Sequence, residues 1–578
     1  MKRVKILRKS MHGLIPGLFL VMSALLINHS CAGSVQNRKP DYPLFISSFE
    51  REDSYIDEEL ELIASLFDHC NPSPGADQVD KLKAFNPDFT ALSAVNSSYC
   101  RSSLTKTDFY TFESKYRHGI SMYKCATLKT ELPAGATSFQ LQALSGSELD
   151  QIASGVGVEG AETSGISKGI RQSGRLSLRA STTEGKYSNK ENSSEKYVTW
   201  LQVGEEYMRI DAWDSISGKI TVTRGFDGTA ATAHPEGSAV LSPVYIGVLG
   251  HTWSGYFPGG FQPIIRYALR IDHPDVHRFK ASEVVNVIRE NHLHGVWLDI
   301  MGYNFFNQSN MRGEQVIPWN FEKQAPYTSA DYKDNQQRKA EGIRKFVEKE
   351  LGKKIILLAN NFSNKYFPEQ GDGEKLLQST EIQPTPLDGL ILEGIGGEYL
   401  HDNFRTGESM VPMLQQMIDM EEKGYAAFCS SDNNRVRKAN TPDELEIKHQ
   451  HEAYGYAAFL MAVEPGGSIK YSIDVYREPS PDNPEPHVWI HPQYFYGIGE
   501  PLQSIHYDQV DSYRLEGTQV YCREFGHAFV FLNVSPDQSF EIDLENTQRI
   551  GNALVNPENE QSVELLEIGP HTGMILMK

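Results

Sequence analysis

The fold class is decided by the stretch Gly295-Val296-Trp297-Leu298-Asp299-Ile300. It is typical of a short buried β-strand, because mostly apolar residues run without a break up to the carboxylate of Asp299. The stretch Asp388-Gly389-Leu390-Ile391-Leu392-Glu393-Gly394 repeats this design and ends on the carboxylate of Glu393. The glycines Gly302 and Gly394 follow the two carboxylates and leave space for a ligand. These stretches predict two strands with the candidate catalytic residues at their carboxyl ends.

Helical and strand-like segments alternate on both sides of these stretches. The expected strands are 42–49, 89–95, 120–123, 245–249, 295–300, 354–360, 387–393, 425–430 and 468–473. The expected helices are 58–67, 280–290, 334–350, 374–380, 410–423 and 442–459. Strands separated by helices pair in parallel, so the pattern predicts an α/β chain and favours a closed (β/α)8 TIM barrel. An open doubly wound sheet is the alternative, although the sequence has no Gly-rich phosphate turn after its first strand.

The α/β pattern is interrupted once and stops before the C-terminus. Residues 129–243 are rich in Gly, Ser and Thr and contain short alternating strands, which predict an inserted all-β domain. The barrel then consists of residues 41–128 and 244–500. The short strands of residues 503–578 predict a C-terminal β-sandwich. Inside the insertion, Thr223-Arg224-Gly225-(x)2-Gly228-Thr229-(x)3-Ala233-His234 resembles a β-module common in phage tail and other surface-exposed proteins, a resemblance that concerns fold alone.

Residues 1–31 have the composition of a signal peptide. Basic residues precede the apolar run 14–27, which is too short for a comfortable membrane span. Cys31 stands where bacterial lipoproteins carry their lipid-accepting cysteine, but Asn28-His29-Ser30 departs from the usual Leu-Ala-Gly, so a lipid anchor is left open. We expect export to the periplasm, the outer membrane or the cell surface.

Charge and cysteine content narrow the class of protein further. The net charge of −20 argues against nucleic acid as a partner, because a phosphate backbone would be repelled. A bridge between Cys100 and Cys125 is conceivable after export, but the spacing of the cysteines matches no metal motif. Buried free thiols are the favoured interpretation.

Two carboxylates at one barrel mouth define the candidate site. One ionised and one protonated carboxyl group are what cleavage of a glycosidic bond requires, which makes Asp299 and Glu393 the candidate catalytic pair. Asn360 and Asn361 end the strand between them and could hold sugar hydroxyls. The other candidate substrate-binding residues are Trp253, Tyr256, Tyr303, His251 and Asp432.

Each of these residues also has a simpler structural interpretation. A strand-terminal Asp can cap a helix or accept loop N–H groups, aromatic side chains pack, and His251 is first of all a polar neighbour of Trp253. Two carboxylates at equivalent strand ends favour the functional interpretation. The sequence has no His-Glu-(x)2-His helix, phosphate loop or Gly-x-Ser-x-Gly elbow, and Asp432 lacks the spacing of a calcium loop. We therefore expect no metal and no cofactor.

The same motifs resemble a known group of proteins. The Gly295–Asp299 stretch, Leu358-Ala359-Asn360 and Asp388-Gly389-(x)3-Glu393-Gly394 follow one another as in the glycosyl-hydrolase-like barrel families of bacteria. The segment Tyr521-(x)-Arg523-Glu524-Phe525 resembles the C-terminal β-domain that those proteins often carry. The resemblance implies a poly- or oligosaccharide substrate. Asp299 follows strand four and Glu393 strand six, a layout similar to α-galactosidase-type barrels, which implies Asp299 as nucleophile and Glu393 as acid/base.

Two other functions remain open at this point. A non-catalytic carbohydrate-binding barrel could use the same carboxylates to bind sugar hydroxyls. A cell-surface scaffold protein could use the β-modules as its working parts, with the barrel as a support.

Overall fold

The computed structural model describes residues 42, 44–48, 55–70, 74–101, 117–143, 200–214, 217, 219–246, 266–299, 301, 308–309, 316–360, 387–392, 394–397, 404–424, 426–430, 442–474, 476–480, 483–490 and 492–578. The chain divides into two compact units. The first consists of Met1–Val95, Glu283–Asp299 and Glu348–Lys578, and the second of Asn96–Ser282 and Ile300–Val347. Among the described residues, no helix is both long and apolar enough to cross a membrane.

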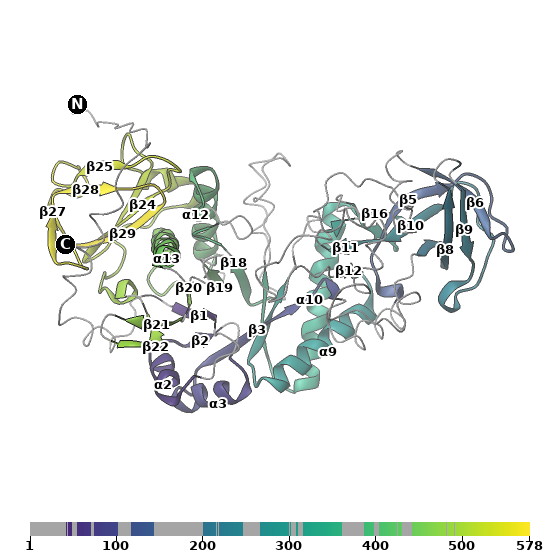
Figure 1. The fold of residues 1–578 in the computed structure, drawn as a ribbon, viewed down its shortest axis with the longest axis horizontal. Helices are drawn as coiled ribbons and strands as arrows, with labels where there is room; N and C mark the ends of the chain where they lie inside the picture. Colours follow the sequence, from purple (N-terminus) through teal and green to yellow (C-terminus); the bar gives the residue numbers. More distant parts are fainter. Residues whose placement is uncertain are drawn as a thin grey trace. The chain divides into compact units, whose positions relative to one another are not determined.

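The first unit is built on a closed ring of strands, several of which are labelled in Figure 1. In ring order they are β1 (Leu44–Ser48), β2 (His69–Cys70), β3 (Thr90–Asn96), β13 (Gly295–Asp299), β17 (Ile356–Asn360), β18 (Gly389–Leu392), β19 (Ala426–Ser430) and β20 (Ile469–Asp474). β20 pairs with β1 and closes the ring, and the recorded strand pairs are parallel. Gly295 and Gly389 begin their strands, where an added Cβ would lie 1.9 Å from the Ile356 carbonyl oxygen and 2.4 Å from that of Ala426. Both positions therefore need glycine for close strand approach.

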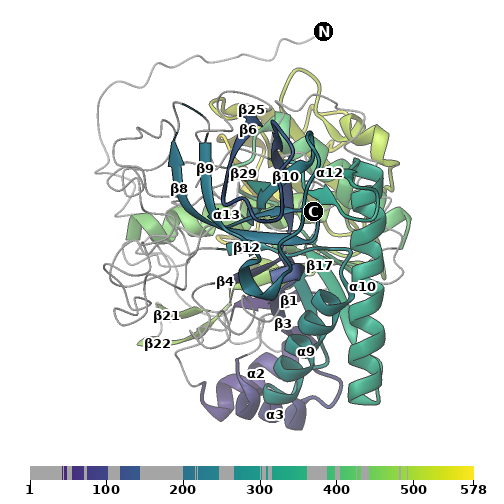
Figure 2. The same cartoon turned by 90° about the vertical axis from the view of Figure 1, so that its right-hand side faces the viewer.

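Helices join consecutive ring strands wherever the connection is described. α2 (Asp57–Leu66) and α3 (Ala76–Phe85) flank β2 and lie side by side (Figure 2), and α9 (Pro274–Glu290) precedes β13. α10 (Ser329–Leu351), α12 (Gly407–Glu422) and α13 (Pro442–Ala462) follow β13, β18 and β19. The expected helix 374–380 lies outside the described residues. The mixed α/β class with a parallel sheet is confirmed, while the complete (β/α)8 repeat stays a prediction.

The C-terminal part of the first unit is all β and packs on α13. One sheet has the order β23 (Val520–Glu524), β24 (Ala528–Asn533), β29 (Thr572–Met577), β26 (Leu554–Asn556) and β27 (Gln561–Val563). β25 (Phe540–Asp543) pairs with β28 (Leu565–Ile568), and side chains from both sheets share one hydrophobic core. These short strands agree with a β-rich C-terminal region, and the finer assignment as a β-sandwich stays a prediction.

Arg523 on β23 ties this β region to the ring. Its guanidinium is 1% exposed and donates to the carbonyl oxygens of Leu460 (2.9 Å) and Val463 (2.7 Å), at the C-terminal end of α13. It also contacts the Glu464 carboxylate at 2.6 Å. A cation is favourable at a helix C-terminus, where the last carbonyl groups lack partners in the helix. This interaction explains why an arginine stands in the Tyr521–Phe525 motif.

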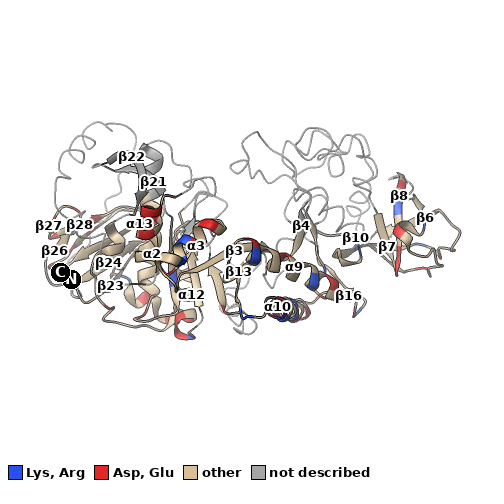
Figure 3. Cartoon of the chain, turned by 90° about the horizontal axis from the view of Figure 1, so that it is seen from below, with Lys and Arg blue, Asp and Glu red and all other residues tan. Residues whose placement is uncertain are grey.

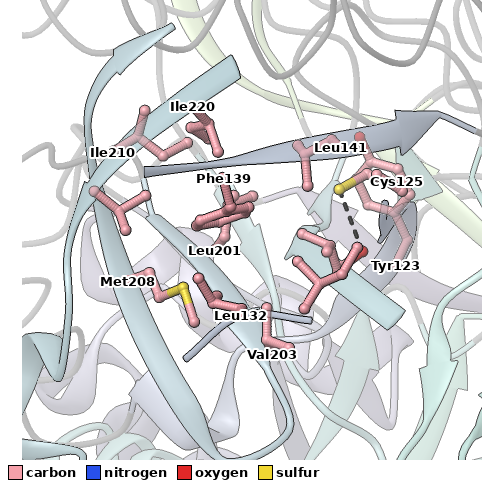
Figure 4. Close-up of a cluster of buried hydrophobic side chains, with 14 of the residues drawn as sticks. Tyr123, Cys125, Leu132, Phe139, Leu141, Leu201, Val203, Met208, Ile210 and Ile220 are labelled. Carbon is pink, nitrogen blue, oxygen red and sulfur yellow. Dashed lines mark hydrogen bonds between the residues drawn. The ribbon is translucent and has the colours of Figure 1, made fainter. Parts of the chain in front are cut away.

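The second unit contains a closed antiparallel barrel of six strands. Its ring order is β10 (Ala239–Pro243), β5 (Met122–Leu128), β6 (Ser138–Ala143), β9 (Lys219–Thr223), β8 (Glu206–Asp214) and β7 (Trp200–Val203). Figure 4 shows its apolar core, in which Phe139, Leu201, Met208 and Ile220 pack together. The Cys125 thiol lies there too and contacts the Val240 carbonyl oxygen at 3.3 Å. Cys70, Cys125, Cys429 and Cys522 are buried free thiols, as expected.

Two strands that the sequence assigned to the parallel barrel belong elsewhere. The segment 120–123 leads into β5, which pairs antiparallel with β10 and β6. The segment 245–249 begins with β11 (Tyr245–Ile246), which pairs antiparallel with β12 (Arg266–Ala268) and β14 (Gln308–Ser309). Both predictions were wrong because a short apolar run does not encode strand direction. The six-stranded barrel, residues 122–243, covers the predicted insertion 129–243, and the compact unit begins at Asn96.

A buried carboxylate explains the Thr-Arg-Gly motif of this barrel. Glu206 is 1% exposed and accepts hydrogen bonds from Arg224 Nε (2.6 Å) and Nη2 (2.7 Å), from the backbone N–H groups of Gly225 and Thr232, and from His234 Nε2 (2.8 Å). Arg224 also donates to three backbone carbonyl groups. The motif therefore folds the 224–234 loop around one carboxylate, which is a structural role.

Candidate active site

The ring encloses an apolar core made by alternate residues of its strands. Leu92, Leu358, Ile391 and Phe428 are buried against one another, and Trp297 packs against them. They come from β3, β17, β18, β19 and β13, so this face of each strand points into the ring. The Trp297 indole Nε1 is buried and finds no acceptor within the described residues.

Asp299 occupies the inner face at the carboxyl end of the ring. It is the last residue of β13 and stands two residues after Trp297, so both side chains leave the same face of the strand. Its side chain is half-buried. The register pairs Leu298 with Ala359, and one further step places Asp299 beside Asn360, the last residue of β17. Sequence reasoning therefore placed Asp299 and Asn360 at neighbouring strand ends, as the structure does.

Most of the other predicted site residues lie outside the described residues. These are Glu393, Asn361, Trp253, Tyr256, Tyr303, His251 and Asp432. For Asn360 the structure describes the backbone alone. β18 ends at Leu392, the residue before Glu393. The pairing of Glu393 with Asp299 consequently stays a prediction.

Two carboxylates of the first unit have structural roles, that of Glu421 on α12 and that of Asp388 immediately before β18. Glu421 is buried on α12 and accepts from the backbone N–H groups of Glu464 (2.9 Å), Ser468 (2.7 Å) and Ile469 (2.9 Å), which shapes the turn before β20. Asp388 accepts from the Leu357 N–H at 2.8 Å and fixes the start of β18. This contact gives Asp388 a structural role.

Titratable groups that sequence reasoning missed lie at the amino end of the ring. Lys470 Nζ is 3.1 Å from His69 Nε2, and His294 Nδ1 accepts from the Ala91 N–H at 3.2 Å. Burial, with Lys470 adding to it, lowers the pKa of His69 to about 4. Burial also lowers the pKa of His294 to about 4, with lysines adding to the effect. Polar groups at this end of a parallel barrel serve stability, because active sites lie at the opposite end. Nothing in the linear sequence signals that His69 and Lys470 meet.

Comparisons with known proteins add little to this geometry. No protein-family model matches the chain, and no curated protein matches it. Similar solved structures include the maltogenic alpha-amylase AmyB from Thermotoga neapolitana (TM-score 0.33, 9% identity, 93% of this chain and 99% of that chain). A xylosidase from Aspergillus niger has TM-score 0.34 and 8% identity over 93% of this chain and 64% of its own. An Anoxybacillus alpha-amylase has TM-score 0.26 and 13% identity over 54% of this chain.

These similarities leave the family and the activity open. The chain spans 64% of the Anoxybacillus enzyme and 63% of a Malbranchea cinnamomea alpha-amylase, less than two thirds of either. A pyruvate kinase from Pyrobaculum aerophilum is similar at the same level, with TM-score 0.25 and 9% identity. The solved structures thus include glycoside hydrolases beside an enzyme of another class, and at these TM-scores they assign neither a family nor a reaction to this chain.

Proposed function

We propose that the chain is a glycoside hydrolase that cleaves an extracellular or periplasmic poly- or oligosaccharide. In this proposal the ring is a complete (β/α)8 barrel, Asp299 is the nucleophile and Glu393 is the acid/base. The observation that carries it is the position of Asp299 at the inner carboxyl end of the fourth ring strand. Catalytic residues of such barrels come from these strand ends.

The packing of the ring core supports a partnership between Asp299 and Glu393. Trp297 is in register with Leu358 and, through it, with Gly389, yet the residue of β18 in its core cluster is Ile391. Inward side chains on alternate strands, such as β13 and β18, therefore pack at the same height in the barrel when the second lies two residues beyond the register partner of the first. This offset is the stagger that an eight-stranded barrel requires. We infer that the same offset, two residues further along, relates Asp299 to Glu393, the residue that follows the last residue of β18.

The spacing of the strands fits the chemistry. Neighbouring strands lie about 4.8 Å apart, so β13 and β18, which have β17 between them, are separated by roughly 9–10 Å along the wall. A nucleophile and an acid/base define a retaining enzyme, whose two carboxyl groups lie about 5–5.5 Å apart. Two inward side chains that lean toward each other across this interval can reach that separation. Asn360 ends β17, the strand between β13 and β18, and in this proposal its amide holds a sugar hydroxyl.

Export belongs to the proposal as well. The basic and apolar pattern of residues 1–31 supports secretion, and Cys31 is the residue that would carry a lipid. Mass spectrometry of the mature N-terminus tests this. A chain that begins at a diacylated Cys31 fits an anchored protein, and retention of Met1 in the cell would contradict export.

A hydrolysis screen with matched variants tests the activity. Wild type, Asp299→Asn and Glu393→Gln are incubated with a panel of glycans, and released reducing ends are measured. Asp77→Asn is the control, because Asp77 is an exposed carboxylate on α3 that removal of one charge should leave functionally silent. We expect cleavage by wild type and Asp77→Asn and its loss in both site variants. Glycan binding without cleavage by any of the four proteins would instead favour a carbohydrate-binding barrel.

A further inference from the structure

A cluster of metal-ligating side chains lies within the second unit and includes none of the residues proposed for catalysis. His118 belongs to a short 3-10 helix, η1 (Arg117–Gly119), whereas His273 immediately precedes α9 and Asp275 lies in its first turn. One ligand atom of each residue lies within 4.8 Å of the others. Segments more than 150 residues apart in the chain thus bring two imidazoles and a carboxylate together.

The distances are close to those of a zinc site. His118 Nε2 and Asp275 Oδ2 are 3.1 Å apart, and the two imidazole rings are 4.7 Å apart at their centroids with a tilt of 53°. Ligands of a tetrahedral Zn²⁺ at about 2.0–2.1 Å from the metal lie roughly 3.3 Å from one another. The His118–Asp275 pair already has this separation, and the third ligand needs to move by no more than about 1.5 Å.

Two arginines, Arg270 and Arg278, lie near the cluster. Arg270 itself is held by Asp272 through two hydrogen bonds. Arg278 contacts Asp275 at 3.2 Å, but its side chain is 64% exposed and free to turn into solvent. Figure 3 shows acidic and basic residues interspersed along α9.

His273 has a second role that the test must separate from metal binding. Its Nδ1 accepts a hydrogen bond from the Asp275 N–H at 3.2 Å and so caps the start of α9. A metal would take Nδ1 in place of this hydrogen bond, or Nε2 after the ring proton moves to Nδ1. In either case the cap is exchanged for a metal bond.

We propose that His118, His273 and Asp275 form a binding site for one Zn²⁺ ion, with water in the fourth position. Two imidazoles and one carboxylate are a common zinc donor set, and partial exposure leaves room for the water ligand. The ion links η1 to the start of α9 within the second unit. The site does not depend on the proposed glycosidase activity.

Zinc titration of the full-length chain tests the site. The protein is stripped with EDTA, dialysed, and titrated with ZnCl₂ by calorimetry, and Co²⁺ is added separately to record its visible absorption. The variants are His118→Gln, His273→Asn and Asp275→Asn. Asn is a good helix N-cap, so His273→Asn removes the imidazole and keeps the capping function. The control is His292→Asn, because His292 is an exposed imidazole beside a single carboxylate, that of Asp80 at 2.8 Å.

The proposal predicts one Zn²⁺ per chain for wild type and His292→Asn, and an affinity at least about 10-fold weaker in each of the three variants. Zinc should also raise the unfolding temperature of wild type and leave that of the variants unchanged. Circular dichroism confirms that each variant is folded. Binding that is equal in wild type and in the folded Asp275→Asn and His118→Gln variants would overturn the proposal, as would the absence of tetrahedral Co²⁺ absorption.

Discussion

The substitution Glu206→Gln has an effect that the structure defines in detail. The two carboxylate oxygens accept five hydrogen bonds, two of them from Arg224. Gln keeps one oxygen and turns the other into an NH₂ group that faces the former donors. The variant therefore loses hydrogen bonds and leaves the buried guanidinium of Arg224 without its counter-ion.

The magnitude follows from the pKa of Glu206. Burial by itself would raise this pKa, but the hydrogen bonds from Arg224, His234 and two backbone N–H groups hold it at about 2, compared with an ordinary value of 4.5. The difference corresponds to about 3 kcal/mol. Solvent near the exposed Thr232 screens the interaction, so we expect about 2 kcal/mol. Because the folded pKa is below the unfolded one, this stability is present above about pH 4.5 and disappears as the pH falls through about 2.

The assay is urea unfolding read by pulsed hydrogen–deuterium exchange of peptides from residues 200–243, at pH 7 and at pH 3. Glu206→Gln should lower the local unfolding free energy by about 2 kcal/mol at pH 7 and by less than half of that at pH 3. Glu205→Gln is the matched control, since Glu205 is the exposed neighbour, and it should match wild type. A loss in Glu206→Gln that is as large at pH 3 as at pH 7 would refute the linkage, and no loss at pH 7 would refute the structural role.

Two further predictions concern glycine and lysine positions in the interior. In Gly467→Ala the new Cβ would lie 1.5 Å from Glu421 Oε1, so the carboxylate must leave its backbone donors, and urea denaturation should show a loss of about 2–3 kcal/mol. Gly135→Ala meets open space, and an equal loss there would contradict the steric reason. Burial lowers the pKa of Lys339 from 10.5 to about 7, so the wild type gains stability as the pH rises from about 7 to 10.5. Lys339→Met should be the more stable protein at pH 7, with an advantage that shrinks by pH 9 in thermal unfolding, and a constant difference would contradict the assignment.

The sequence predicts the positions of those ring strands that are apolar runs ending on a polar residue. The expected strand 295–300 is β13, 354–360 is β17 and 425–430 is β19, because each is a buried run bounded by turn residues. Helices 334–350 and 410–423 were found for the same reason, through apolar residues at helical spacing. The position of Asp299 at a strand end follows from these boundaries alone.

Other features could not be predicted because they depend on contacts between distant segments. β2 consists of His69 and Cys70 alone, too short for any periodicity, and its place between β1 and β3 comes from tertiary pairing. The direction of β5 is decided by its neighbours β10 and β6. The Glu206 network and the His118–Asp275 contact join residues that the sequence separates, so neither could be recognised as a cluster beforehand.

The central claim, that Asp299 and Glu393 cleave glycosidic bonds in different roles, is tested most directly by changing the leaving group. On the natural glycan, kcat/KM should fall by about 10²–10⁴ in Glu393→Gln, because the leaving oxygen loses its acid. On a dinitrophenyl glycoside of the same sugar, whose leaving group needs no proton, Glu393→Gln should form the glycosyl-enzyme nearly as fast as wild type, whereas Asp299→Asn should be inactive on both substrates. Turnover by Asp299→Asn, or an equal loss in Glu393→Gln on both substrates, would contradict the assignment.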